Sequence, residues 1–189
     1  ALRELALRRT ADRVDDQMVE IVDVEKVLAE VLATDDTVPQ QALDGGHQVG
    51  SGTSKVLIVD DSAVARKQII RCLEALGIEV HALNDGREAL NWLQARADEG
   101  ASVADELLMM ISDIEMPEMD GYTLTAEVRN DPRLKDLHVM LHTSLSGVFN
   151  QAMVRKVGAD DFLSKFSADE LAERVLARVR EREVGAGHV

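Results

Sequence analysis

Residues 56–76 read VLIVDDSAVARKQIIRCLEAL, a short apolar run joined to a helical pattern by two aspartates. The run VLIV at 56–59 suits a buried β-strand, because it is short, rich in β-branched residues and followed by polar ones. The next segment carries apolar side chains on one helical face, which consists of Ala65, Ile69, Cys72, Leu73 and Leu76. Gly77 then ends the helical pattern. This stretch predicts a strand followed by a helix.

The same alternation continues along the rest of the chain. Further apolar strand candidates occupy 78–83, 107–112, 138–143 and 161–165. Each is followed by a helical pattern, in turn from 85 through 93, at 124–129, at 147–157 and from 167 onward. Parallel strands need such helical crossovers, so the five units predict an α/β fold with a doubly wound, five-stranded parallel sheet. The apolar run at 107–112 predicts its central strand, buried on both faces.

Composition divides the chain into parts. Residues 34–54 are crowded with Gly, Ser, Thr, Asp and Gln and lose apolar periodicity, which predicts a flexible linker. The main domain is expected at 55–183, with a disordered tail at 184–189. Residues 1–33 hold a strand candidate at 18–24 and a short helical pattern after it, but about thirty residues cannot close a core of their own. We therefore expect a truncated N-terminal appendage, the end of a larger domain.

Charge and composition exclude several function classes. The 189 residues include 21 basic and 35 acidic side chains, a net charge of -14, which repels a phosphodiester backbone and predicts no nucleic-acid partner. No run approaches the roughly 18 apolar residues that a membrane span requires, so no membrane insertion is expected. Cys72 is the only cysteine in the sequence and cannot form an internal disulfide. These features predict a cytoplasmic protein.

Residues with reactive or metal-binding side chains stand at the ends of the predicted strands. Asp60 and Asp61 stand at the end of the first strand, Asp113 at the end of the third, Thr143 at the end of the fourth and Lys165 at the end of the fifth. The carboxyl ends of parallel strands form the ligand-binding edge of such a sheet. Three carboxylates that meet at this edge repel one another unless a cation lies between them, and Mg2+ prefers oxygen ligands. The sequence therefore predicts a Mg2+ site.

Phosphoryl transfer fits this set of side chains. Mg2+ binds few carboxylates and leaves coordination positions for phosphate oxygens. Asp113 would act as the nucleophile, while the Thr143 hydroxyl and Lys165 would contact phosphoryl oxygens as charge develops on them. The five histidines show no metal-ligand spacing, so we interpret His81, His138 and His142 as structural.

Four segments together resemble the receiver domain of two-component response regulators, over about 54–182. They are VLIVDDSAVAR (56–66), SDIEMPEMDGYTL (112–124), MLHTS (140–144) and GADDFLSKF (158–166). The pattern D-x-x-M-P-x-M-D-G is highly specific. The resemblance implies a flavodoxin-like sheet with strand order 2-1-3-4-5.

The same resemblance implies roles for individual residues. Asp113 would be the phosphoacceptor, with Asp60, Asp61 and the backbone carbonyl of Glu115 as further Mg2+ ligands beside it. Thr143 would be the switch hydroxyl, and Phe162 the aromatic residue that turns inward with it. Lys165 would be the lysine that is characteristic of receivers at the end of the fifth strand. A receiver takes its phosphoryl group from a histidine kinase. It is not an enzyme beyond its own phosphorylation and dephosphorylation.

The N-terminal segment carries a second resemblance. RVDDQMVEIVDVEKVLAE, residues 13–30, resembles the closing strands and helix of CheW-type chemotaxis coupling domains. A coupling domain, a linker and a receiver in this order form the layout of the CheV family. This layout implies a CheA-type chemotaxis histidine kinase as a partner, and chemoreceptors through a complete coupling domain.

Three alternatives concern function. A regulator of transcription is disfavoured, because only about seven residues follow the last helix and nothing basic is available to grip DNA. A Mg2+-dependent aspartyl-phosphate phosphatase of the haloacid dehalogenase type requires an Asp two residues after the nucleophile, where this chain has Glu115. A phosphate sink, which drains phosphoryl groups from the kinase, is not separable from coupling control by sequence.

Overall fold

The structure is a computed structural model of the chain. It describes residues 10–14, 17–21, 54–143, 148–164 and 167–186. Two units are separated along the chain, one within 1–37 and the other within 38–189. Each unit is described by itself below.

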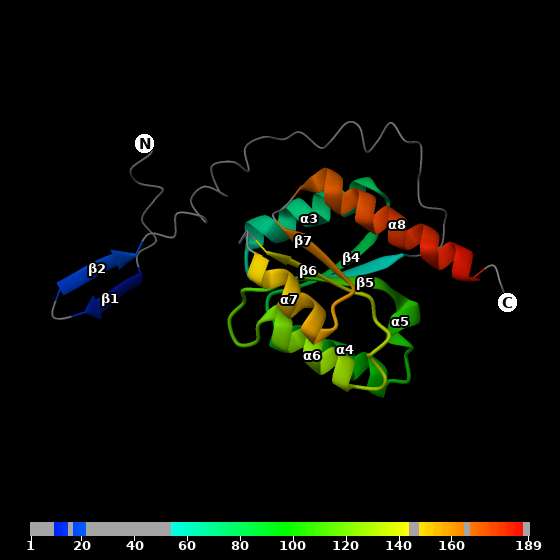
Figure 1. Cartoon of the computed structure of the whole chain (residues 1–189), viewed down its shortest axis with the longest axis horizontal. Helices are drawn as coiled ribbons and strands as arrows, with labels where there is room; N and C mark the ends of the chain where they lie inside the picture. The colour runs from blue at the N-terminus through cyan, green and yellow to red at the C-terminus, as the bar shows by residue number, and fades with distance from the viewer. Residues whose placement is uncertain (1–9, 15–16, 22–53, 144–147, 165–166, 187–189) are drawn as a thin grey trace. The chain divides into compact units, whose positions relative to one another are not determined.

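The larger unit is a five-stranded parallel sheet with helices on both faces (Figure 1). Its strands are β3 (Lys55–Val59), β4 (Glu79–Leu83), β5 (Leu107–Asp113), β6 (Val139–Thr143) and β7 (Asp161–Ser164). Its helices are α3 (Ala63–Ala75), α4 (Gly86–Asp98), α5 (Val103–Glu106), α6 (Gly121–Asn130), α7 (Val148–Val157) and α8 (Ala168–Ala186). The strand order β4-β3-β5-β6-β7 is the predicted order 2-1-3-4-5, which confirms the fold class.

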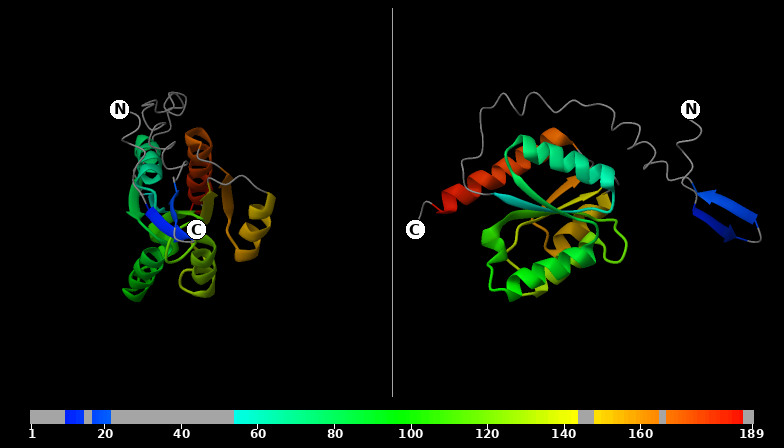
Figure 2. Two further views of the ribbon diagram at one scale, coloured as in Figure 1. Left: turned by 90° about the vertical axis from the view of Figure 1, so that its left-hand side faces the viewer. Right: turned by 180° about the vertical axis from the view of Figure 1, so that it is seen from behind.

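The helices divide between the two faces of the sheet. Figures 1 and 2 show α3 and α8 together on one face, and α4, α6 and α7 on the other. This division follows from the right-handed crossovers between parallel strands. The chain moves in one direction across the sheet from β3 to β4 and in the opposite direction from there to β7, so the connecting helices lie on opposite faces. The central strand β5 is covered on both sides, and its residues 107–112 are all buried, as its unbroken apolar run predicts.

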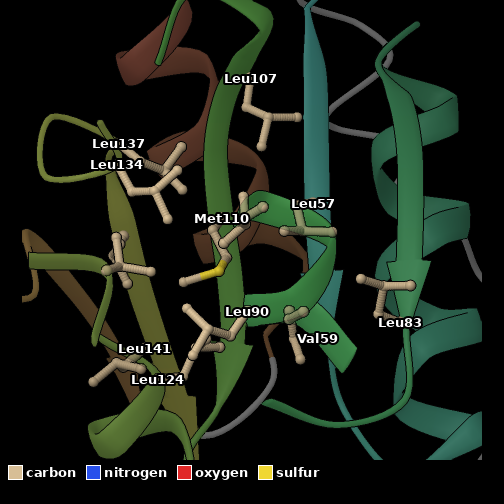
Figure 3. Packing of buried hydrophobic residues seen from close by; sticks show 14 of the residues in the cluster. Leu57, Val59, Leu83, Leu90, Leu107, Met110, Leu124, Leu134, Leu137 and Leu141 are labelled. Carbon is tan, nitrogen blue, oxygen red and sulfur yellow. The ribbon is translucent and has the colours of Figure 1, made fainter. Parts of the chain in front are cut away.

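Two apolar clusters hold the layers together. The α3–α8 cluster includes Ile58, Ile69, Leu73, Ile111, Met140 and Val175. The α4–α6 cluster includes Leu57, Val59, Leu90, Met110, Leu124 and Leu141 (Figure 3). Alternate residues of β3 and β6, and of β5 from Met109 onward, therefore enter opposite clusters, and a strand residue's position decides which face of the sheet it serves.

Side-chain caps fix the start of several helices. The backbone N–H of Ala65 donates to the Ser62 hydroxyl at the start of α3, and that of Glu88 donates to Asp85 at the start of α4. Asp120 caps α6 by accepting from the Thr123 N–H at 2.7 Å. Because this cap acts at Asp120, α6 begins at Gly121, earlier than the predicted helix at 124–129.

Two further differences from the sequence expectations concern helices. The short helix α5 lies within the polar stretch before β5, where no helix was predicted. The segment 184–189, expected as a disordered tail, begins inside α8, because that helix continues to Ala186. Residues 180–183 are Arg and Glu, which favour helix and carry it past the expected end of the domain at 183.

The smaller unit contains an antiparallel hairpin of β1 (Thr10–Val14) and β2 (Gln17–Ile21). The strand predicted at 18–24 corresponds to β2, and β1 was not predicted. The helical pattern that follows 18–24, and residues 34–53 of the linker predicted at 34–54, lie outside the described residues. No helix in the described part of the chain is long and apolar enough to cross a membrane.

Candidate functional site

Three carboxylates gather at the carboxyl ends of the neighbouring strands β3 and β5. Asp60 and Asp61 follow β3, and Asp113 is the last residue of β5. Each of the three offers a carboxylate oxygen, and these oxygens all lie within 4.8 Å of one another. We call them the acidic cluster. The convergence that the strand pattern predicts for these three residues is therefore present, and three hard oxygen donors in this arrangement fit a Mg2+ ion.

The turn from β3 to α3 holds Asp60 in place. Asp60 is only 2% exposed, and its Oδ1 accepts a hydrogen bond of 2.7 Å from the backbone N–H of Ser62. The Arg66 guanidinium, one turn into the helix, donates to the Asp60 backbone carbonyl. Both backbone and side chain of Asp60 are thus oriented by residues of its own turn, which the sequence DDSAVAR encodes locally.

The electrostatic environment of Asp113 is unusual for an aspartate. Burial raises its pKa from 3.8 to about 7, and the charges of Asp60 and Asp61 act in the same direction. The nearby His142 and the backbone N–H of Ile114 lower the pKa and offset part of this effect. Without a cation, the folded chain therefore resists a full negative charge on Asp113. A bound cation removes that resistance, because it stabilises the ionised form.

The glycine of the M-D-G motif allows the backbone to approach Asp113 closely. The Gly121 N–H donates to the Ile114 carbonyl at 2.9 Å, which ties the start of α6 to the residue after Asp113. A Cβ atom at Gly121 would lie 2.2 Å from the Asp113 carbonyl oxygen, closer than any side chain can be accommodated. The motif at 113–121 is therefore a tight loop that returns to the strand end from which it started.

Thr143 and Phe162 lie on one face of neighbouring strands. Thr143 ends β6 and is 1% exposed, while Phe162 is partly buried against the α4–α6 cluster. In the register of β6 and β7, Phe162 pairs with Leu141, two residues before Thr143. Because alternate residues of a strand share a face, Thr143 and Phe162 occupy diagonal positions on the same side of the sheet.

Two further predicted site residues, Glu115 and Lys165, come after strands β5 and β7. Glu115 stands two residues after Asp113, in the bend that follows β5, and its side chain is exposed. Lys165 lies outside the described residues, directly after Ser164, where β7 ends. Its predicted contact with a phosphoryl group stays a prediction.

His142 joins the site although its sequence position suggested only a structural role. Its Nε2 lies 3.2 Å from Asp60 Oδ2, and the residue is 7% exposed. Metal-ligand spacing along the sequence does not reveal this contact, because Asp60 and His142 come from strands far apart in the chain. The register of β5 and β6 explains the contact, because it places His142 opposite Asp113.

The chain belongs to the response regulator receiver domain family, whose pattern it matches over residues 56–176. Chemotaxis protein CheV3 of Helicobacter pylori is 30% identical over 162 residues, which cover 85% of this chain and 51% of the relative. Protein PilG of Pseudomonas aeruginosa is 35% identical over 127 residues, 66% of this chain and 87% of the relative. The resemblance to receivers that the motifs indicate is confirmed.

The solved structures show the same fold. Chemotaxis protein CheY4 of Vibrio cholerae superposes with a TM-score of 0.56 at 32% identity, and the match covers 68% of this chain and 99% of that one. The chain spans about half the length of the CheV proteins that it matches. The alignment with CheV3 is longer than residues 55–189, so the similarity reaches beyond the receiver toward the N-terminus.

Proposed function

We propose that this chain is the phosphoacceptor part of a CheV-type chemotaxis signalling protein, and that Asp113 receives the phosphoryl group. The observation that carries the proposal is the acidic cluster at the strand ends of a receiver domain, in which Asp113 is partly buried and has a pKa of about 7. The donor would be a phosphohistidine on a CheA-type kinase. Among the relatives, CheV3 is a chemotaxis protein and CheAY a sensor histidine kinase.

The transfer step is a displacement at phosphorus. A carboxylate oxygen of Asp113 forms the new O–P bond while the P–N bond to the kinase histidine breaks, and the imidazole nitrogen keeps the electron pair. When bound, Mg2+ supplies positive charge to phosphoryl oxygens, and Asp60, Asp61, Asp113 and the Glu115 carbonyl would hold it. Burial of Asp60 and partial burial of Asp113 limit the water that competes for the same positions.

The response to phosphorylation would involve both strands beyond β5. Thr143 would move its hydroxyl toward a phosphoryl oxygen, and Lys165 would pair with another. Phe162 would then turn inward on the face that it shares with Thr143. This change would alter the surface of α7, β7 and α8. The chain itself would catalyse only its own phosphorylation and dephosphorylation.

The biological output would be altered coupling between chemoreceptors and their kinase in the cytoplasm. The basis is the N-terminal segment at 13–30, which resembles the end of a CheW-type coupling domain and is overlapped by the range of similarity to CheV proteins. A complete coupling domain would be needed to bury a core and to dock on a receptor.

Mass spectrometry after treatment with acetyl phosphate or phosphoramidate tests the phosphoacceptor role. Wild type with Mg2+ is expected to gain one phosphoryl group, and Asp113→Asn is expected to gain none. Asp136→Asn, which changes an exposed aspartate away from the acidic cluster, is the matched control and should be labelled like wild type. Labelling of Asp113→Asn, or equal labelling of wild type in excess EDTA, would refute the assignment.

A second experiment separates coupling control from a phosphate sink. Receptor–kinase arrays are reconstituted with the full-length protein, and kinase activity and loss of label from the kinase are followed for wild type and Asp113→Asn. Coupling control predicts that the phosphorylated protein changes kinase activity itself. Unchanged activity together with faster loss of label would favour the sink.

A further inference from the structure

The imidazole of His142 is buried beside the acidic cluster. Its residue is 7% exposed, and Nε2 faces Asp60 Oδ2 at 3.2 Å. This nitrogen is fully buried, and within the part of the chain that the structure describes it makes no hydrogen bond of regular geometry. A buried polar nitrogen of this kind is costly unless it serves a charged neighbour, and the neighbour here is a carboxylate.

Strand alternation explains why this side chain and the acidic cluster meet. Asp60, Asp113 and His142 each stand two positions after a member of the α3–α8 cluster, respectively Ile58, Ile111 and Met140. The three polar side chains therefore continue one face of the sheet beyond its apolar core. Asp113 and His142 are direct partners in the β5–β6 register.

The contact from His142 to Asp60 spans the strand between them. β6 and β3 are not neighbours, because β5 lies between them in the sheet, and two strand spacings amount to about 9.5 Å. The imidazole and the carboxylate must therefore meet over the end of β5, next to Asp113. This geometry places His142 against the acidic cluster rather than at its outer rim.

We propose that His142 is a positioning residue that holds the Asp60 carboxylate in the orientation needed for cation binding. The Ser62 N–H donates to Oδ1 at 2.7 Å, and His142 Nε2 lies 3.2 Å from Oδ2, so each oxygen of the carboxylate has a polar neighbour. Groups that orient a ligating carboxylate in this way raise cation affinity without touching the cation. This inference rests on the proposed Mg2+-dependent function of the cluster.

Cation binding by the unphosphorylated chain tests the proposal without any phosphodonor. Mg2+ is titrated by calorimetry, and Mn2+ by electron paramagnetic resonance, into wild type and variants of His142. His142→Leu removes the nitrogen at similar volume and is expected to weaken binding about tenfold or more. His142→Gln can place an amide nitrogen near the Nε2 position and is expected to bind within about threefold of wild type. His142→Asn is too short to reach Asp60 and should behave like His142→Leu.

His138→Leu is the matched control, because it makes the same change at the opposite end of β6, where His138 faces Asp160. Its cation affinity should equal that of wild type.

Should His142→Leu fail to fold, as judged by circular dichroism, the comparison of His142→Asn with His142→Gln gives the answer. Equal or tighter binding by the folded Leu or Asn variant, or equal weakening in Gln, overturns the positioning role. Absence of binding by wild type overturns the proposed metal site and this inference together, whereas wild-type binding with unaffected variants overturns this inference alone.

Discussion

The folded chain tolerates the acidic cluster because neighbouring groups offset the electrostatic repulsion between its carboxylates. Asp60 is buried but receives a backbone N–H from Ser62 and faces His142. At Asp113 the compensation is incomplete, because burial and the neighbouring carboxylates raise its pKa to about 7. Between about pH 4 and pH 7, a carboxyl group with this pKa holds a proton that an exposed aspartate has already released. The free energy of unfolding of the metal-free chain should therefore depend on pH through this residue.

We expect Asp113→Asn to stabilise the metal-free chain by an amount that grows with pH. The pKa of Asp113 is raised in the folded chain from 3.8 to about 7, so the unfolded chain releases this proton first. The stability that depends on the protonated form is complete below about pH 4 and is lost as pH rises toward 7. An amide cannot ionise, so the variant avoids this loss. Thermal unfolding in EDTA at pH 5 and pH 8 should show the larger gain at pH 8.

Asp136→Asn is the control for this pH dependence, since its carboxylate is exposed. Any change in its stability should be similar at the two pH values. Excess Mg2+ should reduce the advantage of Asp113→Asn, because the cation binds the wild-type cluster more tightly. A gain for Asp113→Asn of the same size at pH 5 and pH 8 would contradict the raised pKa.

We expect Gly121→Ala to destabilise the receiver by about 2 kcal/mol or more, because overpacking against backbone cannot be relieved by a rotamer change. The added Cβ would lie 2.2 Å from the Asp113 carbonyl oxygen. Gly185→Ala is the control, since a Cβ there meets nothing within 4 Å on exposed α8. It should leave stability unchanged or raise it slightly. Urea unfolding measures both, and equal midpoints for Gly121→Ala and wild type would disprove the close contact.

At the site, local sequence patterns identified residues that end strands. Asp60, Asp61 and Asp113 were predicted to meet because parallel strands end at one edge, and their oxygens do meet within 4.8 Å. His142 was interpreted as structural, because its contact with Asp60 depends on the order and register of three strands. Such a contact joins distant segments and leaves no spacing signal in a single sequence.

Secondary-structure elements in this chain are tied together by charged side chains at their ends. Arg129, in the last turn of α6, donates to the backbone carbonyls of Lys135, Leu137 and Gly158 at 2.7–2.9 Å. It also donates to Asp160 Oδ2 at 2.6 Å. One guanidinium thus joins the end of α6, the approach to β6 and the loop from α7 to β7. These links lie at the opposite end of the strands from the acidic cluster.

We expect Arg129→Ala to lower the free energy of unfolding by about 2–4 kcal/mol, because several carbonyls lose a donor at once. Arg129→Lys should recover only part of this, since an ammonium group cannot reproduce the planar fork. Arg133→Ala removes a neighbouring arginine that is itself 46% exposed and pairs with Asp131 and with the exposed Asp98, and it should change stability little. Urea unfolding of the three variants tests the ranking. A similar loss for Arg129→Ala and Arg133→Ala would show that the Arg129 network does not contribute as described.

Among the elements, the strands were predicted well and the helix ends less so. Short apolar runs bounded by polar residues define β3, β5 and β6 almost to the residue. The start of α6 was placed late, because the Asp120 cap precedes the first apolar residue of the helix. The four-residue α5 escaped because a single turn shows no periodicity. Element ends depend on caps and contacts that a pattern of apolar residues does not contain.

At the scale of the molecule, the chain consists of a receiver and a smaller N-terminal unit. Both apolar clusters of the receiver consist of residues between 56 and 179. The acidic cluster lies within the same range. The smaller unit contributes a two-stranded hairpin, a structure that is marginally stable by itself.

We therefore expect a shortened chain of residues 54–189 to fold, to bind Mg2+ and to accept a phosphoryl group like the full chain. The physical reason is that every described member of the core and of the acidic cluster is retained when residues 1–53 are removed. The thermal midpoint, the Mg2+ affinity and the rate of labelling by acetyl phosphate should agree between the two chains within experimental scatter. A second deletion that also removes residues 168–189 serves as the control, because it takes away α8 with Leu171 and Val175 from the α3–α8 cluster and should abolish cooperative unfolding. A midpoint for 54–189 several degrees below that of the full chain would instead mean that the N-terminal residues stabilise the receiver directly.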